Sequence, residues 1–243
     1  MRSLIRLVAA TALSLTFAAC ASEPAKESAK KPAKESARES AGESAGDPLK
    51  TLPDNYKLQF ENDYVKVVRV HYDAGAKLPE HIHPAGSTAY VYLNDNDAVL
   101  FNHAGAGERP GGRPLERPPV KAGGARFATS HEEHHTVENI SSTPTDFVRI
   151  WYKTDNAGLT NNVRRRIPLS EQEFSNKQTR ITRPAFEAGK PLVLAPSDFP
   201  SLVVAWPSGK LQWVEAKATA AVPTDGPDTL GFVRIEFLTA PSK

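Results

Sequence analysis

The sequence predicts an all-β protein. Short runs rich in β-branched and aromatic residues recur between turn-forming clusters, as in Tyr64–Tyr72, which ends at Asp73-Ala74-Gly75. No segment before residue 160 places its apolar residues at the helical period. The pattern of the first half also recurs in the second, which indicates a duplicated β-unit. The 243 residues suffice for one large domain or two small ones.

Residues 1–20 have the features of a secretory signal. Arg2 and Arg6 precede an apolar run, Leu7–Ala19, which is too short to span a membrane as a mature helix. Small residues then lead to Cys20, and this arrangement resembles a bacterial lipoprotein signal, whose cysteine becomes the lipidated N-terminus. No Asp follows Cys20 directly, so we expect an outer-membrane anchor with the protein facing the periplasm.

Residues 21–50 form a low-complexity segment after the signal. Variants of Ala-Lys-Glu-Ser recur in it, and residues 21–48 contain no aromatic or branched apolar side chain that could build a core. We therefore expect a disordered tether between the lipid anchor and a folded body.

Charge and cysteine content exclude several classes of function. The 30 basic residues exceed the 28 acidic ones by two, and Arg2 and Arg6 account for the excess. A balanced mature chain gives no indication of nucleic-acid binding or of electrostatic attachment to a membrane. Cys20 is the single cysteine, which excludes disulfides, cysteine-ligated zinc and thiol catalysis.

The remaining strands of the first half follow from the same kind of pattern. Gly- and Pro-rich residues 102–124 predict an extended loop among them, and residues 169–174 are compatible with one turn of helix. The expected strands lie at residues 64–72, 89–93, 98–101, 126–129 and 147–152.

The strongest indication of function is Gly75-Ala-Lys-Leu-Pro-Glu-His81-Ile-His83. Residues two apart in a strand point to the same face, so His81 and His83 project side by side. Two imidazoles so placed can hold one first-row transition-metal ion, with a third ligand from elsewhere in the chain.

A second cluster, Ser130–Asn139, supplies candidates for that ligand. With the first motif it resembles the cupin superfamily, a double-sheet jelly-roll barrel, or double-stranded β-helix. Three positions match Gly-x5-His-x-His, the first part of the family's first motif. Two positions match His-x3-Asn, the last part of its second motif. The matching residues are Gly75, His81 and His83 in the first motif and His135 and Asn139 in the second.

This resemblance implies a three-histidine metal site of His81, His83 and His135. The family's glutamate ligand is missing, because Ser87 or Thr88 stands in its place. The metal would be Fe, Mn, Zn, Ni or Cu, and the sequence does not choose among them.

Four further residues are possible additional ligands. Glu133 lies two residues before His135 and shares its face if the strand is regular. His131, His134 and Asn139 remain open because the sequence leaves the register of this segment undetermined.

The repeat predicts two cupin-like units, a metal-binding unit at 51–158 and a degenerate one at 159–243. A single elaborated barrel is the alternative. Ala195 and Ser197 occupy the two histidine positions of the second copy, and no histidine follows His135, so that copy cannot hold an imidazole-bound metal. The segments that correspond are 72–83 with 186–197, 89–93 with 202–206, and 147–154 with 232–239.

Arg149 and Arg234 stand at matching points of this repeat. Equivalent positions favour a structural role, such as pairing with a carboxylate. The alternative is that Arg149 binds a carboxylate of the substrate.

Three functions are consistent with these observations. The first is a lipid-anchored, mononuclear metal enzyme of the cupin dioxygenase type, acting on a small molecule. The second is a non-catalytic envelope protein that holds a metal or a small ligand. The third is an envelope structural protein whose histidines have no metal-binding role. The sequence indicates no organic cofactor and no nucleic-acid partner, and it leaves open whether the chain forms a homodimer.

Overall fold

The computed structural model describes residues 46–103, 114–160 and 163–242, and most of these residues lie in strands or in the turns between them. The expected signal peptide, Cys20 and all but the end of the expected tether lie outside the described residues. No helix in the described part of the chain is long and apolar enough to cross a membrane.

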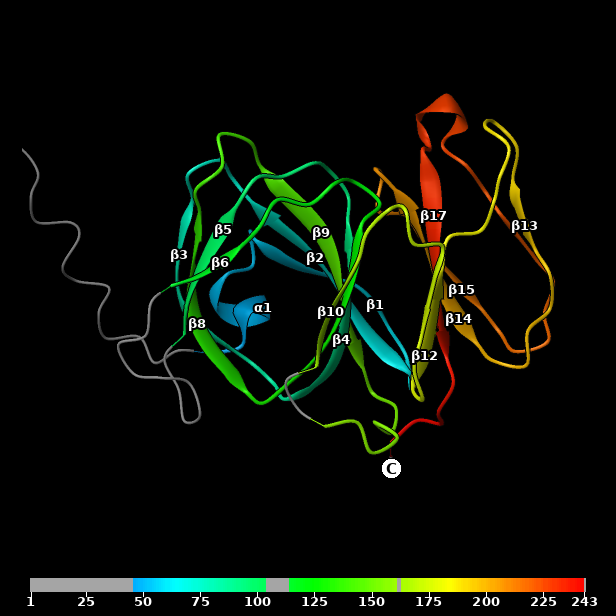
Figure 1. Cartoon of the computed structure of the whole chain (residues 1–243), viewed down its shortest axis with the longest axis horizontal. Helices are drawn as coiled ribbons and strands as arrows, with labels where there is room; N and C mark the ends of the chain where they lie inside the picture. Colours follow the sequence, from blue (N-terminus) through cyan, green and yellow to red (C-terminus); the bar gives the residue numbers. More distant parts are fainter. Residues whose placement is uncertain (1–45, 104–113, 161–162, 243) are drawn as a thin grey trace, which may run out of the picture. The chain divides into compact units, whose positions relative to one another are not determined.

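The elements alternate between strands and tight connections, with two very short helices (Figure 1). In chain order they are α1 (Pro48–Thr51), β1 (Tyr56–Glu61), β2 (Val65–Tyr72), β3 (Lys77–His83), β4 (Gly86–Tyr92), β5 (Val99–His103), β6 (Leu115–Arg117), β7 (Ala125–Ser130), β8 (Glu133–Asn139), β9 (Thr145–Tyr152), β10 (Arg164–Ile167), β11 (Glu173–Ser175), β12 (Thr179–Thr182), β13 (Leu192–Leu194), β14 (Ser201–Trp206), β15 (Leu211–Val214), β16 (Ala220–Val222), the 3-10 helix η1 (Gly226–Asp228) and β17 (Gly231–Phe237).

Strands β2–β9 form a jelly roll. One sheet has the order β1-β2-β9-β4-β7-β10 and the other β3-β8-β5-β6, with every neighbouring pair antiparallel. Numbered one to eight, the strands from β2 to β9 take the orders 1-8-3-6 and 2-7-4-5, which result when a long hairpin rolls into two facing sheets. The predicted all-β jelly-roll fold is therefore confirmed.

The second half repeats this order without counterparts of β5, β6 and β10 among its described strands. The sheet β11-β12-β17-β14-β15 corresponds to β1-β2-β9-β4-β7, and the pair β13-β16 corresponds to β3-β8. Gly75 and Gly189, which the sequence repeat aligns, both have positive φ values, +70° and +77°, and each lies in the turn before the equivalent strand.

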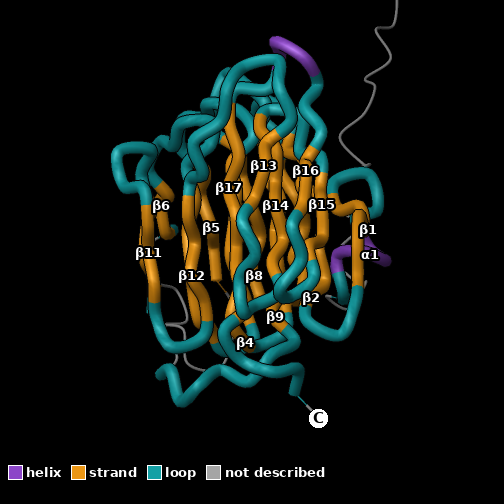
Figure 2. Tube along the Cα trace, turned by 90° about the vertical axis from the view of Figure 1, so that its right-hand side faces the viewer, coloured by secondary structure: helices purple, strands orange, loops and turns teal. Residues whose placement is uncertain are grey.

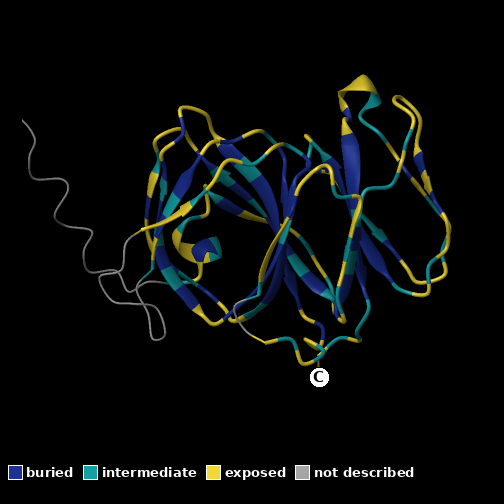
Figure 3. Ribbon diagram, viewed as in Figure 1, coloured by how far each residue is buried: buried dark blue, intermediate teal, exposed yellow. Residues whose placement is uncertain are grey.

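The sheets stack in layers with a hydrophobic core in each gap (Figures 1 and 2). Alternation along β2 sends Val65 and Val67 into the core shared with the five-stranded sheet, and Val68 and Val70 into the barrel. A third core lies between the five-stranded sheet and the β13-β16 pair. Figure 3 shows that the central strands of the stack are buried along most of their length.

Three features differ from the sequence-based expectations. Strand β6 and the bridge between Asn96 and Val120 lie within the predicted loop 102–124, of which residues 104–113 are outside the described ranges. Strand β10 pairs with β7 although it follows the predicted boundary at 158. Residues 169–174 form a turn and the start of β11 instead of a helical turn. Residues 44–243 form one compact unit, and the limits 51–158 and 159–243 remain predictions.

Candidate metal centre

The two strands that carry the histidines are neighbours in the four-stranded sheet. His81 and His135 are direct partners across β3 and β8, and His83 is paired with Glu133. A register shift between Leu78 and His81 resets the alternation of β3, so that Leu78, His81 and His83 are all buried. Strand β8 alternates regularly, which places Glu133, His135, Val137 and Asn139 on its inner side.

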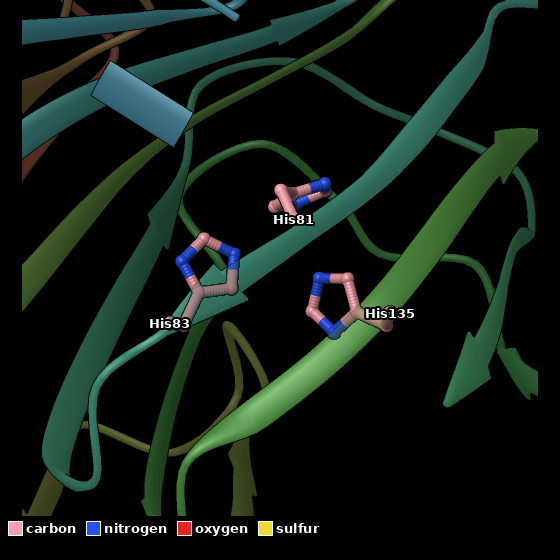
Figure 4. Close-up of side chains that lie close together, drawn as sticks. All are labelled: His81, His83 and His135. Carbon is pink, nitrogen blue, oxygen red and sulfur yellow. The ribbon is translucent and has the colours of Figure 1, made fainter. Parts of the chain in front are cut away.

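The three imidazoles face one another inside the barrel (Figure 4). One nitrogen from each of His81, His83 and His135 lies within 4.8 Å of the others. Ring centroids are 4.7 Å apart for His81 and His135, 4.9 Å for His81 and His83, and 5.0 Å for His83 and His135. The side chains are 0%, 0% and 1% exposed. The structure thus brings together the three residues that the motifs selected.

These histidines have the free nitrogens that a metal site requires. Both ring nitrogens of His83 and of His135 are buried and have no hydrogen-bond partner among the residues that the structure describes. A buried polar atom without a partner is costly, and bonding to an ion removes that cost. Two nitrogens bound to the same zinc ion lie at most about 4.2 Å apart, so small rotations of the rings would let the cluster close on one ion.

His81 is oriented by a hydrogen bond at each end of its ring. Its Nδ1 lies 2.9 Å from the carbonyl oxygen of Pro79 and its Nε2 lies 2.9 Å from the hydroxyl of Tyr56. Because the carbonyl can only accept, Nδ1 carries the proton, and Nε2 is the nitrogen with a lone pair for a metal. The Tyr56 hydroxyl, which is also 2.7 Å from that of Tyr72, donates to this lone pair.

Burial keeps all three imidazoles neutral, which is the form that binds metals. Burial and the nearby Arg149 lower the pKa of His81 to about 4. Burial, followed by Arg149 and His135, lowers the pKa of His83 well below the usual value, and burial and His81 do the same for His135.

Glu133 is buried on the same side of β8 as His135, but it lies outside the histidine cluster. Its Oε2 lies 3.6 Å from Nη2 of Arg149, the arginine on β9. Burial alone would raise the pKa of Glu133, but Arg149 and Arg117 lower it, so the group is a carboxylate. Arg234 is likewise paired with Glu236, at 3.8 Å, so both arginines of the repeat have the expected carboxylate partner.

The other possible ligands also lie outside the cluster. His134 is on the outer side of β8, where its Nε2 is 2.8 Å from Glu132. His131 is exposed in the bend before β8. Asn139 donates to the carbonyls of Asp73 and Thr143 and braces the loops at the barrel end.

Two residues near the cluster were not predicted from the sequence. Tyr56 comes from β1, at the far end of the other sheet, and nothing in its local sequence indicates contact with His81. His103 pairs with His135 across β5 and β8, with ring centroids 5.2 Å apart. Its spacing of two from the apolar Phe101 could have placed it on the inner face.

The fold and the site define a jelly-roll protein with a buried three-histidine cluster. No protein-family model matches the chain, and no curated protein matches it. Solved structures that resemble it include a cupin domain from Bordetella pertussis Tohama I, which is 23% identical, covers 40% of this chain and 91% of its own, and has a TM-score of 0.33. A cupin superfamily protein from Desulfitobacterium hafniense is 11% identical, with 40% and 74% covered and a TM-score of 0.27.

A bacterial pirin from Escherichia coli, in complex with nickel(II), is also similar. It is 13% identical over 76% of this chain and 90% of its own, with a TM-score of 0.45. Because these identities are below 25% and the TM-scores below 0.5, the similarities carry no functional assignment to this chain.

Proposed function

We propose that this protein is a lipid-anchored, periplasm-facing metalloprotein that binds one divalent transition-metal ion through His81, His83 and His135 and acts on a small molecule as a metal-dependent oxidoreductase. The observation that carries the metal site is the convergence of three buried, neutral imidazoles, two of which have otherwise unbonded nitrogens. The lipid anchor is supported by the sequence around Cys20 alone.

The residues around the cluster would define its environment. A bound ion would supply O2 activation if it is Fe or Cu, or Lewis acidity if it is Zn. Trp151 lies 5.6 Å from His83 and Phe101 lies 5.2 Å from His135, measured between ring centroids, and these rings keep water away from the imidazoles. Tyr56, whose pKa burial raises well above the usual value, offers a protonated hydroxyl beside His81.

A non-catalytic metal-holding role is the second candidate. The near-complete burial of the three side chains favours it, because burial restricts the access of a substrate to the ion. The two candidates differ in one measurable property, the presence of an exchangeable position on the bound metal.

Metal analysis of the full chain tests the proposed site. We expect about one ion per chain in the parent protein and a loss of nearly all of it in the double variant His83→Ala/His135→Ala, because a single remaining imidazole binds a divalent ion weakly. His134→Ala is the matched control, since it removes the neighbouring histidine on the outer side of β8. Equal metal content in all three proteins would refute the site.

Activity is then tested on the metal-loaded protein. Azide should change the visible spectrum of the Co(II)-loaded or Cu(II)-loaded chain if a coordination position is open. Oxygen uptake with a panel of small molecules should follow. A fully loaded site without a spectral change or turnover would favour the non-catalytic role.

A further inference from the structure

Three arginines gather in the barrel beside the histidine cluster. Arg149 and Arg126 flank Tyr90 in one row across β9, β4 and β7 of the six-stranded sheet. Their guanidinium carbons lie 5.4 Å and 4.1 Å from the centre of the Tyr90 ring. Arg117, from β6 of the facing sheet, lies 3.8 Å above the ring of Phe101.

This arginine cluster, Arg117, Arg126 and Arg149, is adjacent to the histidines. Arg149 stacks 4.4 Å from the ring of Trp151, which in turn contacts His83. The Phe101 ring beneath Arg117 contacts His135. A ligand held by the arginines would therefore lie next to the imidazoles.

The positive charge of the arginine cluster is not balanced within the described part of the chain. Glu133 is the carboxylate ion-paired with Arg149, and no second carboxylate is paired with Arg117 or Arg126 among the described residues. The Nε atoms of all three arginines, and Nη2 of Arg149, are buried and lack hydrogen-bond partners in that part of the chain. Buried guanidinium nitrogens without hydrogen-bond partners are costly, and an anion that bonds to them removes this cost.

The electrostatic effect of the cluster is visible on Tyr90. Burial alone would raise the pKa of this tyrosine, but Arg149 and Arg126 lower it below the usual value. A buried phenol with a lowered pKa indicates a strongly positive potential at this point of the barrel.

A cavity at the edge between β6 and β7 reaches two members of the cluster, Arg117 and Arg126. It has a volume of about 210 Å³, and its other lining residues include the exposed Arg164 and Glu116 and the side chains of Tyr92 and Val120, whereas Arg149 lies behind Tyr90 and does not line it. This is several times the ~30 Å³ that one water molecule takes up in the liquid. The space suits a small organic molecule with an apolar body.

We propose that Arg117, Arg126 and Arg149 form a binding site for the carboxylate group of a small organic acid and hold it beside the histidine cluster. A guanidinium fork matches the two oxygens of a carboxylate, and the aromatic rings on which the arginines lie would contact the acid's apolar body. The proposal extends the proposed function by naming the chemical class of its substrate, and it can be tested without a metal.

Benzoate and its neutral isostere benzamide are the probes, measured by calorimetry on the full chain freed of metal with a chelator. We expect saturable binding of benzoate, at least tenfold weaker binding of benzamide, and at least tenfold weaker binding of benzoate to Arg126→Gln, since a charged hydrogen bond is lost. Arg165→Gln is the control, because Arg165 is on the neighbouring strand and pairs with Glu171 outside the cavity. Arg126→Lys keeps the charge but removes the planar guanidinium group, so it tests whether benzoate binding needs two parallel N–H donors.

Four results would overturn the proposal. These are equal binding of benzoate and benzamide, no saturable benzoate binding at millimolar concentration, unchanged binding in Arg126→Gln, and binding of inorganic phosphate in place of benzoate. The His83→Ala/His135→Ala variant should still bind benzoate. A chain that binds benzoate but no metal would thus refute the metal site and leave the carboxylate site intact.

Discussion

At the scale of single residues, Tyr56 decides how accessible the metal-binding nitrogen of His81 is. Its hydroxyl donates a hydrogen bond to the lone pair of Nε2 over 2.9 Å, and a second hydrogen bond, with the hydroxyl of Tyr72, fixes its position. A metal ion that uses this nitrogen must displace the hydroxyl. Tyr56 is therefore a competitor for His81 and sets part of the metal affinity.

Tyr56→Phe should therefore bind Zn(II) more tightly than the parent protein. The hydrogen bond that the metal must replace contributes about 0.5–1.5 kcal/mol, which corresponds to a decrease in Kd of up to about tenfold. Competition with a chromophoric chelator measures this. Tyr152→Phe is the control, because it removes a buried hydroxyl bonded to Thr179 away from the site. Weaker zinc binding by Tyr56→Phe would mean that the hydroxyl supports the metal instead of competing with it.

At the scale of elements, a histidine and an aspartate form a titratable pair near one end of the β2–β9 ladder. His71 and Asp146 are paired across these strands, with Nδ1 of the imidazole 3.1 Å from Oδ2 of the carboxylate. Nε2 lies 3.1 Å from Asp73 in the following turn. Partial burial lowers the pKa of His71, but the hydrogen bonds to Asp73 and Asp146 outweigh it, and the net pKa is raised.

The free energy of unfolding should therefore depend on pH through His71. A raised folded-state pKa stabilises the protein fully below the unfolded value of about 6.5, and this contribution is lost as the pH rises through the folded value. His71→Gln should cost more stability near pH 6 than near pH 8, as measured by urea unfolding at both pH values. In the Asp146→Asn background the same substitution should cost less at low pH. A cost that does not change with pH would contradict this assignment.

At the scale of the whole folded unit, residues 44–243, the six-stranded sheet is covered on both faces. Its barrel side packs in the core with Tyr90 and Phe147, and its other side shares a core with Leu202 and Ile235 of the five-stranded sheet. A sheet buried on both faces gains stability from each neighbour. We infer that the metal-free second copy supports the barrel wall that carries Arg149 and Trp151.

Leu202→Ala tests this support. Leu202 is 0% exposed, and a buried leucine truncated to alanine costs about 2–5 kcal/mol. Because the core is shared, hydrogen exchange should accelerate in β9 of the barrel as well as in β14. The exposed Leu230→Ala should change neither. Faster exchange confined to β14 and its neighbours in the second copy would show that the two halves unfold separately.

The sequence by itself determined the fold class and the pair His81 and His83. Both depend on local patterns, since alternation along a strand sets which side chains share a face, and a spacing of two places His81 and His83 together. The choice of His135 among the histidines of its segment came from the resemblance of its motif to a known family. Glu133 also lies on the inner face, as regular alternation from His135 predicted. The matching segments of the repeat were visible because both copies contain Phe-Val-Arg-Ile, at 147–150 and 232–235, and because Gly75 and Gly189 stand at equivalent points before their strands.

Only the tertiary structure decided which distant residues meet these local faces. The pairing of β3, β8 and β5 brings His103 beside His135, and the placement of β1 brings Tyr56 to His81. The facing of the two sheets brings Arg117 near Arg126. The same strand pairing also decides that Glu133 forms an ion pair with Arg149 and lies outside the histidine cluster. Strand partners are chosen by the burial of whole sheets, a sum over contacts far apart in the chain, and no short segment carries that information.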